Sequence, residues 1–524
     1  MTWIRLLAIL LITLSTAATA APPAGLEQQV ETLRQKVGAI GIAIAIVEGS
    51  ETTLARGWGV RRLGDPTAVD ADTLFQTGST GKAVTAAALA VLVDQGRIGW
   101  DDPVIRHLPW FRMHDPWVTR EITVRDLLVH RSGLGLGQGD LLFVPRSRLS
   151  RRETVERIAH LQPRTSFRAA YAYDNILYAV AGQLIEEVSG QRWEDFVRDR
   201  VLRPGGMMTA TSDNDDRFRN PNRAHPHARL SGPVRGMGPQ QLLDERDELG
   251  RAAAPAGGLA FSARDQAAWL RLQLAAGALP DGGRLLSQQQ MAEMWKPVTI
   301  MPGSRLPEPL KAAQPNFQAY ALGWQVQDYR GHRMITHGGA VFGAIARVVI
   351  LPDRNVAFAI MMNSEDSGLM LGLTYMLVDH YLGLPDPGWI DLWENWYQSR
   401  LRAGAGAVAR SAATPARVGP SLPLERYAGR YRDPWYGDVV IGHGPGGLTV
   451  DFTTNPGMTG RLRHWQYDSF VTVFDDPGIE PAHVTFSLDA DGRVRAVSLR
   501  RVNPFADFSW NYQDLDLRPV EGGK

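Results

Sequence analysis

The sequence predicts an α+β domain followed by a smaller all-β domain. Apolar, β-branched segments lie near both ends of residues 25–400, and helical patterns lie between them. After a stretch rich in Ala, Gly, Arg and Pro, short segments of alternating apolar and polar residues take over. A chain of 524 residues is also longer than one hydrophobic core usually spans, which favours two domains.

Residues 1–20 have the pattern of a signal peptide. Arg5 supplies the positive end, residues 6–14 the apolar stretch, and residues 18–20 (Ala-Thr-Ala) a small-residue cleavage site before Ala21. The alternative is an uncleaved membrane anchor, for which the apolar run is short. With no cysteine, the chain has no lipid-attachment site and no disulfide. We expect a periplasmic or secreted protein without a stable membrane anchor after cleavage.

The elements of the first domain follow from their periodicity. Residues 26–37 carry a helical apolar stripe, residues 39–47 (AIGIAIAIV) form a strand buried on both faces, and residues 53–60 form a second strand. An alanine-rich apolar helix covers residues 82–94. Further helical patterns cover residues 124–128, 176–188 and 263–275, and further strands cover residues 321–327, 343–351 and 356–362. Because strands lie at both ends, we expect the domain, residues 25–400, to close by bringing its two ends together.

The remaining chain reads as a linker and an all-β domain. Residues 401–423 have no repeating apolar face, which predicts an interdomain linker. Residues 424–521 contain strand patterns separated by Gly, Asp and Pro, which indicates a small antiparallel barrel or sandwich. The strand patterns are at residues 436–441, 448–452, 470–474, 484–488 and 494–499.

Charge and histidine spacing argue against two classes of function. The formal net charge is +1 and no basic run stands out, so nucleic acid is not an expected partner. His225 and His227 are the main sequence signal for a metallohydrolase, but they have no spaced acidic partner. We expect no metal and no cofactor, and a small molecule or short peptide as substrate.

Ser79 and Lys82 form the first motif with catalytic chemistry. Residues i and i+3 lie on one face at the start of a helix, so the Lys82 amine can reach the Ser79 hydroxyl. The helix N-terminus also favours the developing alkoxide. The alternative is a helix-capping serine ahead of a surface lysine, yet Lys82 begins the most apolar helix and a buried lysine needs a partner.

Two further motifs supply groups that an acyl transfer needs. Tyr173 and Asn175 stand just before a predicted helix, where a phenol can relay a proton and an amide can hold a substrate carbonyl. The alternative is an aromatic loop with Asn175 capping the helix. His337, Gly338 and Gly339 precede the strand near residue 343, where glycines let a substrate lie along a strand edge. The amide of the following residue, Ala340, can form half of an oxyanion hole, although a Gly-rich turn explains the same pattern.

The three motifs in this order resemble the β-lactamase-related serine hydrolases, a family of class C β-lactamases, DD-peptidases, D-aminopeptidases and esterases. Residues 75–78, 122–134 and 255–259 agree with it, and the resemblance covers residues 25–384. It implies a β-lactamase/transpeptidase-like domain, with an antiparallel sheet flanked by helices and a helical subdomain. The tail resembles the lipocalin-like domain attached to some members. The resemblance implies a nucleophile, Ser79; a shared base, Lys82 with Tyr173; substrate-binding residues, Asn175, His337, Gly338 and Gly339; and an oxyanion hole from the amides of Ser79 and Ala340.

One departure bears on the substrate. Many relatives carry Lys-Thr-Gly where His337-Gly338-Gly339 stands, and the ammonium and hydroxyl of that trio grip a carboxylate. Gly338 has no hydroxyl, and a histidine is mostly neutral at pH 7. We therefore expect an acyl-enzyme hydrolase of amide or ester bonds, with a D-aminopeptidase-like peptidase or an esterase favoured. The alternatives are a β-lactamase or DD-carboxypeptidase, and a non-catalytic sensor of the penicillin-binding type.

Overall fold

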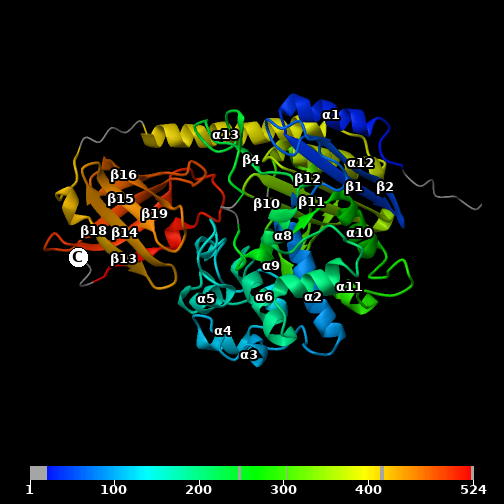
Figure 1. The fold of residues 1–524 in the computed structure, drawn as a ribbon, viewed down its shortest axis with the longest axis horizontal. Helices are drawn as coiled ribbons and strands as arrows, with labels where there is room; N and C mark the ends of the chain where they lie inside the picture. Colours follow the sequence, from blue (N-terminus) through cyan, green and yellow to red (C-terminus); the bar gives the residue numbers. More distant parts are fainter. Residues whose placement is uncertain (1–20, 246–248, 304, 413–417, 521–524) are drawn as a thin grey trace, which may run out of the picture.

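The chain forms two bodies joined by one long helix. The computed structural model describes residues 21–245, 249–303, 305–412 and 418–520, and the expected signal peptide lies outside them. Figure 1 shows the larger body, the barrel beside it, and helix α13 (Trp389–Ala412) running from one to the other. Within the described ranges, no helix combines the length and the apolarity needed to cross a lipid bilayer.

An eight-stranded antiparallel sheet organises the larger body. One pairing joins the two ends of the domain, as expected: β1 (Gly41–Glu48) runs beside β12 (Val356–Met362), with Ala45 opposite Ala359. The strand order is β2-β1-β12-β11-β10-β9-β8-β7. The other six strands of this sheet are β2 (Glu51–Gly59), β7 (Thr299–Ile300), β8 (Gln318–Tyr320), β9 (Gln325–Tyr329), β10 (His332–Val341) and β11 (Ala344–Leu351).

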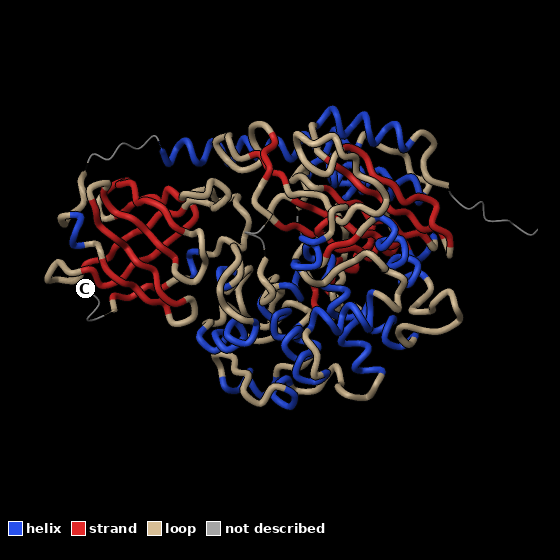
Figure 2. The backbone as a smooth tube through the Cα atoms, viewed as in Figure 1, coloured by secondary structure: helices blue, strands red, loops and turns tan. Residues whose placement is uncertain are grey.

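Helices cover both faces of this sheet, which is why β1 is buried along its whole length. Its isoleucines, such as Ile42 and Ile44, pack against α1 (Leu26–Val37) and α12 (Ser367–Leu382). Its alanines face the other core, which contains α2 (Lys82–Asp94), α6 (Ile176–Ser189) and α10 (Ala263–Leu274). Figure 2 shows the sheet between these two helical layers.

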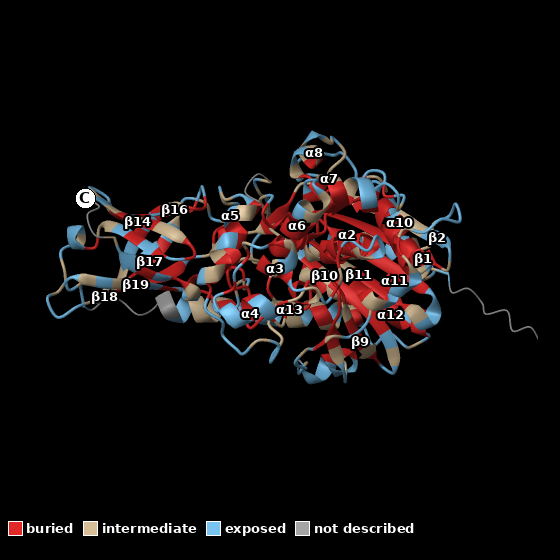
Figure 3. Ribbon diagram, turned by 90° about the horizontal axis from the view of Figure 1, so that it is seen from below, coloured by how far each residue is buried: buried red, intermediate tan, exposed pale blue. Residues whose placement is uncertain are grey.

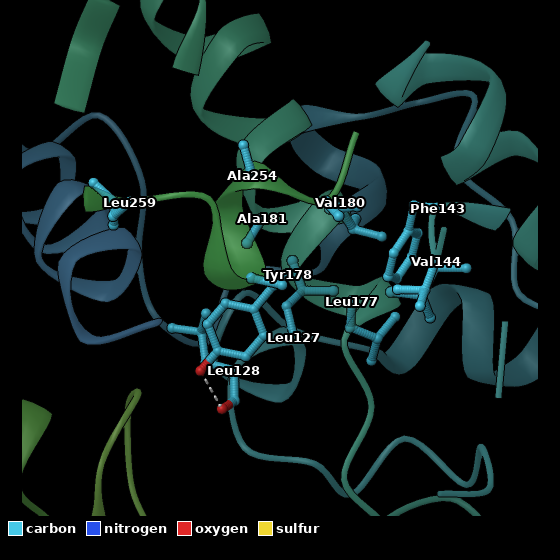
Figure 4. Close-up of a cluster of buried hydrophobic side chains, with 14 of the residues drawn as sticks. Leu127, Leu128, Phe143, Val144, Leu177, Tyr178, Val180, Ala181, Ala254 and Leu259 are labelled. Carbon is cyan, nitrogen blue, oxygen red and sulfur yellow. Dashed lines mark hydrogen bonds between the residues drawn. The ribbon is translucent and has the colours of Figure 1, made fainter. Parts of the chain in front are cut away.

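In the view of Figure 1, a helical subdomain lies below the sheet and contains further buried apolar side chains. In Figure 4, Leu177 and Val180 of α6 pack beside Phe143 and Val144, and the Tyr178 hydroxyl donates a hydrogen bond to the Leu128 carbonyl, at 2.9 Å. The shorter elements are β3 (Phe75–Gln76), β4 (His227–Arg229), β5 (Gln240–Leu242), β6 (Ala260–Phe261), α3 (Val104–His107), α4 (Pro116–Glu121), α5 (Arg151–Glu156), α7 (Trp193–Val197), α8 (Asn214–Arg219), α9 (Ala254–Gly257) and α11 (Gln288–Met294).

The C-terminal body is a closed antiparallel barrel, which decides between the barrel and the sandwich. Its strands pair in sequence order and the last pairs with the first. Aromatic rings fill it, among them Tyr427, Tyr431 and Phe486. The strands are β13 (Gly429–Asp433), β14 (Gly437–Gly444), β15 (Gly447–Phe452), β16 (Thr459–Gln466), β17 (Ser469–Phe474), β18 (Ala482–Leu488), β19 (Val494–Arg501) and β20 (Asp516–Pro519).

Two local expectations differ from the structure. Residues 401–412, expected in the linker, are the last turns of α13, because alanine and arginine favour a helix already begun at the buried Trp389. The helical pattern at residues 124–128 is a single 3-10 turn, η2 (Arg125–Leu127). The buried Asp126 holds the start of that turn by accepting hydrogen bonds from the Thr123 amide and from Arg168.

The barrel packs directly against the larger body. The side-chain amide of Asn455 donates to the Pro145 carbonyl at 2.6 Å, and the rings of Phe342 and Trp510 stack at 5.5 Å between centroids. Residues 502–511, here called the barrel loop, connect β19 to the turn before β20 and lie in this contact. Figure 3 shows buried residues in the sheet, in the helices around α2 and α6, and inside the barrel.

Candidate active site

Ser79 and Lys82 are held together by one turn of chain. Ser79 is half-buried in η1 (Gly78–Gly81), a 3-10 turn that continues directly into α2, and Lys82 is the first residue of that helix. The Nζ atom of Lys82 lies 3.0 Å from the Oγ atom of Ser79, and the Lys82 side chain is fully buried. The lysine is therefore part of the site and not a surface residue.

Three oxygen atoms surround the Lys82 amine. Besides Ser79 Oγ, these are Oδ1 of Asn175 at 2.7 Å and the carbonyl oxygen of Ala256 at 2.8 Å. Burial lowers the pKa of Lys82 to about 7, and the charges of Asp140 and Asp174 raise it in opposition. At neutral pH much of the amine is thus uncharged. Its N–H bonds can then point at Asn175 and Ala256 and its lone pair at the serine hydroxyl.

Tyr173 lies over the same two groups. Its ring centre is 4.8 Å from Lys82 Nζ, and its hydroxyl makes a hydrogen-bonding contact with that of Ser79. Burial raises the pKa of the phenol well above its usual range, while the contact with Ser79 lowers it. The phenol is therefore protonated at neutral pH. It can relay a proton because its hydroxyl donates one hydrogen bond while its oxygen accepts another.

Asn175 stands before α6 with its amide between two charged groups. Its Oδ1 accepts from Lys82, and its Nδ2 donates to Oδ2 of Asp140 at 2.8 Å. Asn175 makes no side-chain cap to α6, so the helix-capping alternative does not describe it. One N–H of the amide is left over, and Asn175 lines the cleft at Ser79.

Two glycines let strand β10 approach Ser79. A Cβ atom on Gly339 would lie 1.9 Å from the Thr77 carbonyl oxygen, and one on Gly78 would lie 2.6 Å from the Ala340 nitrogen. Gly78 also has φ of +52°, which disfavours other residues. The residues 337–339 therefore form part of a strand rather than a turn, and their close approach brings the Ala340 amide to the turn that carries Ser79.

His337 is buried and bound within the protein on both sides of its ring. Its Nδ1 lies 2.6 Å from the Gly338 carbonyl oxygen, which can only accept, so Nδ1 carries the proton. Its Nε2 then accepts from the Tyr320 hydroxyl at 2.7 Å. Burial, and next the charge of Lys82, lowers the pKa of His337 to about 3. The imidazole is neutral at pH 7 and both its nitrogens are occupied.

Two cavities meet at Ser79. One, of about 330 Å³, extends toward α13 and the barrel; the other, of about 530 Å³, runs along the edge of β10. The barrel loop lines both of them with Asp507 and Ser509, and Phe508 places its ring 5.7 Å from that of Tyr173. The C-terminal domain is thus a wall of the candidate active site.

Three further residues of this site lie outside the sequence motifs: Asp140, Ser509 and Arg347. Arg347 lies opposite Gly338 in the β10–β11 pairing and lines the β10 cavity, and its Nε atom has no hydrogen-bond partner among the described residues. Burial lowers its pKa, which leaves it charged at neutral pH. Spacing from a known motif would not reveal any of the three, because each is brought in by another element.

The histidine pair considered for a metal has internal partners. His227 Nε2 accepts from the Leu63 amide at 3.0 Å, and Nδ1 donates to the Asn363 carbonyl at 2.9 Å. His225 Nδ1 lies 3.8 Å from a carboxylate oxygen of Glu245. Across the described ranges, no three His, Asp or Glu side chains gather as a metal site would require.

The chain was compared with known proteins. A family model described as Beta-lactamase matches residues 26–381, and one described as a domain of unknown function (DUF3471) matches residues 413–519. An unguisins hydrolase of Aspergillus campestris (strain IBT 28561) is 30% identical over 420 residues, which are 76% of this chain and 74% of that protein. Penicillin-binding protein 4 of Amycolatopsis lactamdurans is 30% identical over 346 residues, 64% of this chain and 84% of that protein.

Solved structures share the fold at lower identity. The octameric penicillin-binding protein homologue from Pyrococcus abyssi has a TM-score of 0.55 at 19% identity, covering 91% of this chain and 98% of its own. A D-stereospecific amidohydrolase from Streptomyces sp. has a TM-score of 0.52 at 23% identity, covering 68% of this chain and 98% of its own.

Proposed function

The chain belongs to the β-lactamase family of hydrolases, and from that premise we propose that it hydrolyses amide or ester bonds through an acyl-enzyme on Ser79. The observation that carries the proposal is the 3.0 Å contact between Ser79 Oγ and the buried amine of Lys82. A lysine with a pKa of about 7 is a base suited to neutral pH.

The proposed reaction has two halves. In the first, Ser79 Oγ bonds to the substrate carbonyl carbon as its proton passes to neutral Lys82, and negative charge develops on the carbonyl oxygen toward the amides of Ser79 and Ala340. The amine or alcohol then leaves with a proton returned through Lys82 and Tyr173. In the second half, water adds to the carbonyl carbon of the Ser79 ester and gives a proton to the same pair, which returns it to Ser79 Oγ as the bond from that oxygen to the acyl carbon breaks and the acid leaves.

Two classes of substrate are supported by different observations. Neutral, fully engaged His337 favours peptides cleaved from an amino end, or esters, because it offers no cation at the position that grips a carboxylate in many relatives. Arg347 is a cation on the same cavity, and its Nε atom has no partner among the described residues, which favours a carboxylate-bearing substrate such as a β-lactam or a D-alanyl peptide. A relative named penicillin-binding protein 4 supports this second candidate.

One purified sample tests both the reaction and its substrate. Turnover is measured on a neutral ester, a D-aminoacyl anilide and a cephalosporin, with wild type beside Ser79→Ala. The proposal expects at least one substrate to turn over, and the variant to lose about 10⁴-fold or more of that rate. Turnover that persists in Ser79→Ala would contradict it, and binding of all three without turnover would favour the non-catalytic sensor.

A further inference from the structure

Asp140 is a buried carboxyl group that no step of the proposed reaction uses. It begins the short turn 140–142 and is fully shielded from solvent. Its Oδ2 accepts two hydrogen bonds, from Asn175 Nδ2 at 2.8 Å and from the Ser509 hydroxyl at 2.8 Å. Its Oδ1 has no hydrogen-bond partner among the described residues. A carboxyl buried with so few donors is costly, so its place beside the site needs an explanation.

These contacts form one hydrogen-bond chain from the barrel to the nucleophile. Ser509 donates to Asp140, Asn175 donates to Asp140, and Lys82 donates to the other end of the Asn175 amide at 2.7 Å. Lys82 in turn lies 3.0 Å from Ser79. Ser509 is 369 residues from Asp140 in sequence, so only docking of the barrel supplies this first link.

The carboxylate fixes which way the Asn175 amide faces. An ionised carboxylate only accepts hydrogen bonds, so while Asp140 is ionised the amide nitrogen has to face it and the amide oxygen has to face Lys82. A flipped amide would present N–H groups to the Lys82 amine and leave the lysine one acceptor short. The Lys82 amine, with acceptors fixed at Asn175 and Ala256, then keeps its third direction for Ser79.

We infer that Asp140 is a positioning residue, which orients the Asn175 amide and through it the Lys82 amine, and that the barrel completes the catalytic site through Ser509. This inference rests on the proposed role of Ser79. The C-terminal domain then does more than line the cavity at Ser79: it supplies a hydrogen bond that helps to orient the catalytic residues.

Removing the charge of Asp140 should shift the pKa of Lys82 in a direction that can be measured. Burial lowers the pKa of Lys82, and Asp140 raises it, so removing this charge lets the amine lose its proton at lower pH. Burial raises the pKa of Asp140 to about 7, and the bonds from Asn175 and Ser509 lower it, so loss of Ser509 makes Asp140 less often charged. The other groups that face the pair are Asp174, Asp507, His130, His337, Tyr173 and Tyr178, of which the last four are neutral at pH 7.

The experiment measures how fast a fluorophosphonate modifies Ser79 as a function of pH, in the full-length chain. Asp140→Asn keeps an acceptor for Asn175 but removes the charge. The acidic limb of the profile, where the rate falls as the pH is lowered, should move to lower pH by about one unit. Asp140→Ala also frees the amide, and should lower the rate at the plateau by about tenfold or more. Ser509→Ala should shift the limb in the same direction by a smaller amount.

A matched control separates positioning from stability. Asn455→Ala removes another buried hydrogen bond between barrel and larger body, the one to Pro145, together with the bond from the Tyr436 hydroxyl, and touches no member of the hydrogen-bond chain. It should lower the melting temperature without moving the limb.

The outcomes separate the two proposals. This inference alone would be overturned if the rate of Ser79 modification fell with pH in Asp140→Asn and in Ser509→Ala as it does in wild type. If Asp140→Asn fails to fold, the single hydroxyl removed in Ser509→Ala decides the question. Wild type that is not modified at Ser79 would instead overturn the proposed function, and this inference with it.

Discussion

A Cβ atom on Gly339 would lie 1.9 Å from the carbonyl oxygen of Thr77, so at this glycine β10 closely approaches the backbone that leads into the Ser79 turn. The contact is backbone on backbone, so no side chain can move aside to relieve it. The relative placement of the Ser79 and Ala340 amides depends on this approach.

Gly339→Ala should therefore damage turnover more than folding. The strand has to shift outward, and a misplacement of about 1 Å can cost on the order of 100-fold in rate. Gly338→Ala is the neighbouring comparison, because its Cβ would meet only an end atom of Arg347 at 3.5 Å. The measurement is kcat/KM and melting temperature of both variants, and equal losses in the two would show that the approach of Gly339 does not matter.

The rate should fall as the medium becomes acidic. Burial lowers the pKa of Lys82 to about 7, so above that pH the amine is neutral and able to accept the Ser79 proton. Below it, kcat/KM should fall by up to about tenfold for each pH unit, over a range in which the coupled carboxyl of Asp140, whose pKa burial raises to about 7, also takes up a proton. Lys82→Arg keeps its charge throughout and should lose the activity at every pH. A flat profile from about pH 5 to about pH 9 in wild type would exclude Lys82 as the base.

Tyr173→Phe should slow catalysis while leaving the fold intact. The ring keeps its place against His130, whose ring centre is 4.2 Å away, and only the hydroxyl that contacts Ser79 is lost. Loss of a proton-transfer group typically costs roughly 10²–10⁴-fold. The measurement is kcat beside the melting temperature, and unchanged kcat would remove Tyr173 from the mechanism.

Arg347 should decide how well a carboxylate-bearing substrate is accepted. A charge-assisted hydrogen bond contributes about 1.5–3 kcal/mol, which corresponds to about tenfold or more in kcat/KM. Arg347→Gln should therefore reduce kcat/KM for a cephalosporin or a D-alanyl peptide, and spare the matching carboxylate esters. Arg347→Lys keeps the charge and should retain part of the difference. An acid-to-ester ratio that is the same in all three proteins would place carboxylate recognition elsewhere.

Motifs held within one element could be predicted from the sequence. The Ser79–Lys82 contact needs only one helical turn, and β1 carries the unbroken apolar run of a strand buried on both faces. The pairing of β1 with β12 followed from strand patterns at the two ends of the domain. Five of the barrel strands also alternate clearly enough to be seen.

Features made by distant or weakly patterned residues could not be predicted. Strand β16 has exposed Arg461 and Arg463 on either side of Leu462, and a glycine fills the next inward position, so its alternation is faint. The barrel loop reaches the site only after the barrel has closed and docked. Asp140 stands in a glycine-rich turn with no spacing to the Asn175 amide that it binds, and its partner Ser509 comes from the far end of the chain.

Mass spectrometry of the enzyme quenched with acid during turnover of an ester or a penicillin tests the acyl-enzyme on Ser79 itself. We expect a mass increase equal to the acyl group on the peptide that contains Ser79, present in wild type and absent in Ser79→Ala. An adduct on any other peptide, or steady turnover with no trapped acyl group in either protein, would exclude the acyl-enzyme on Ser79.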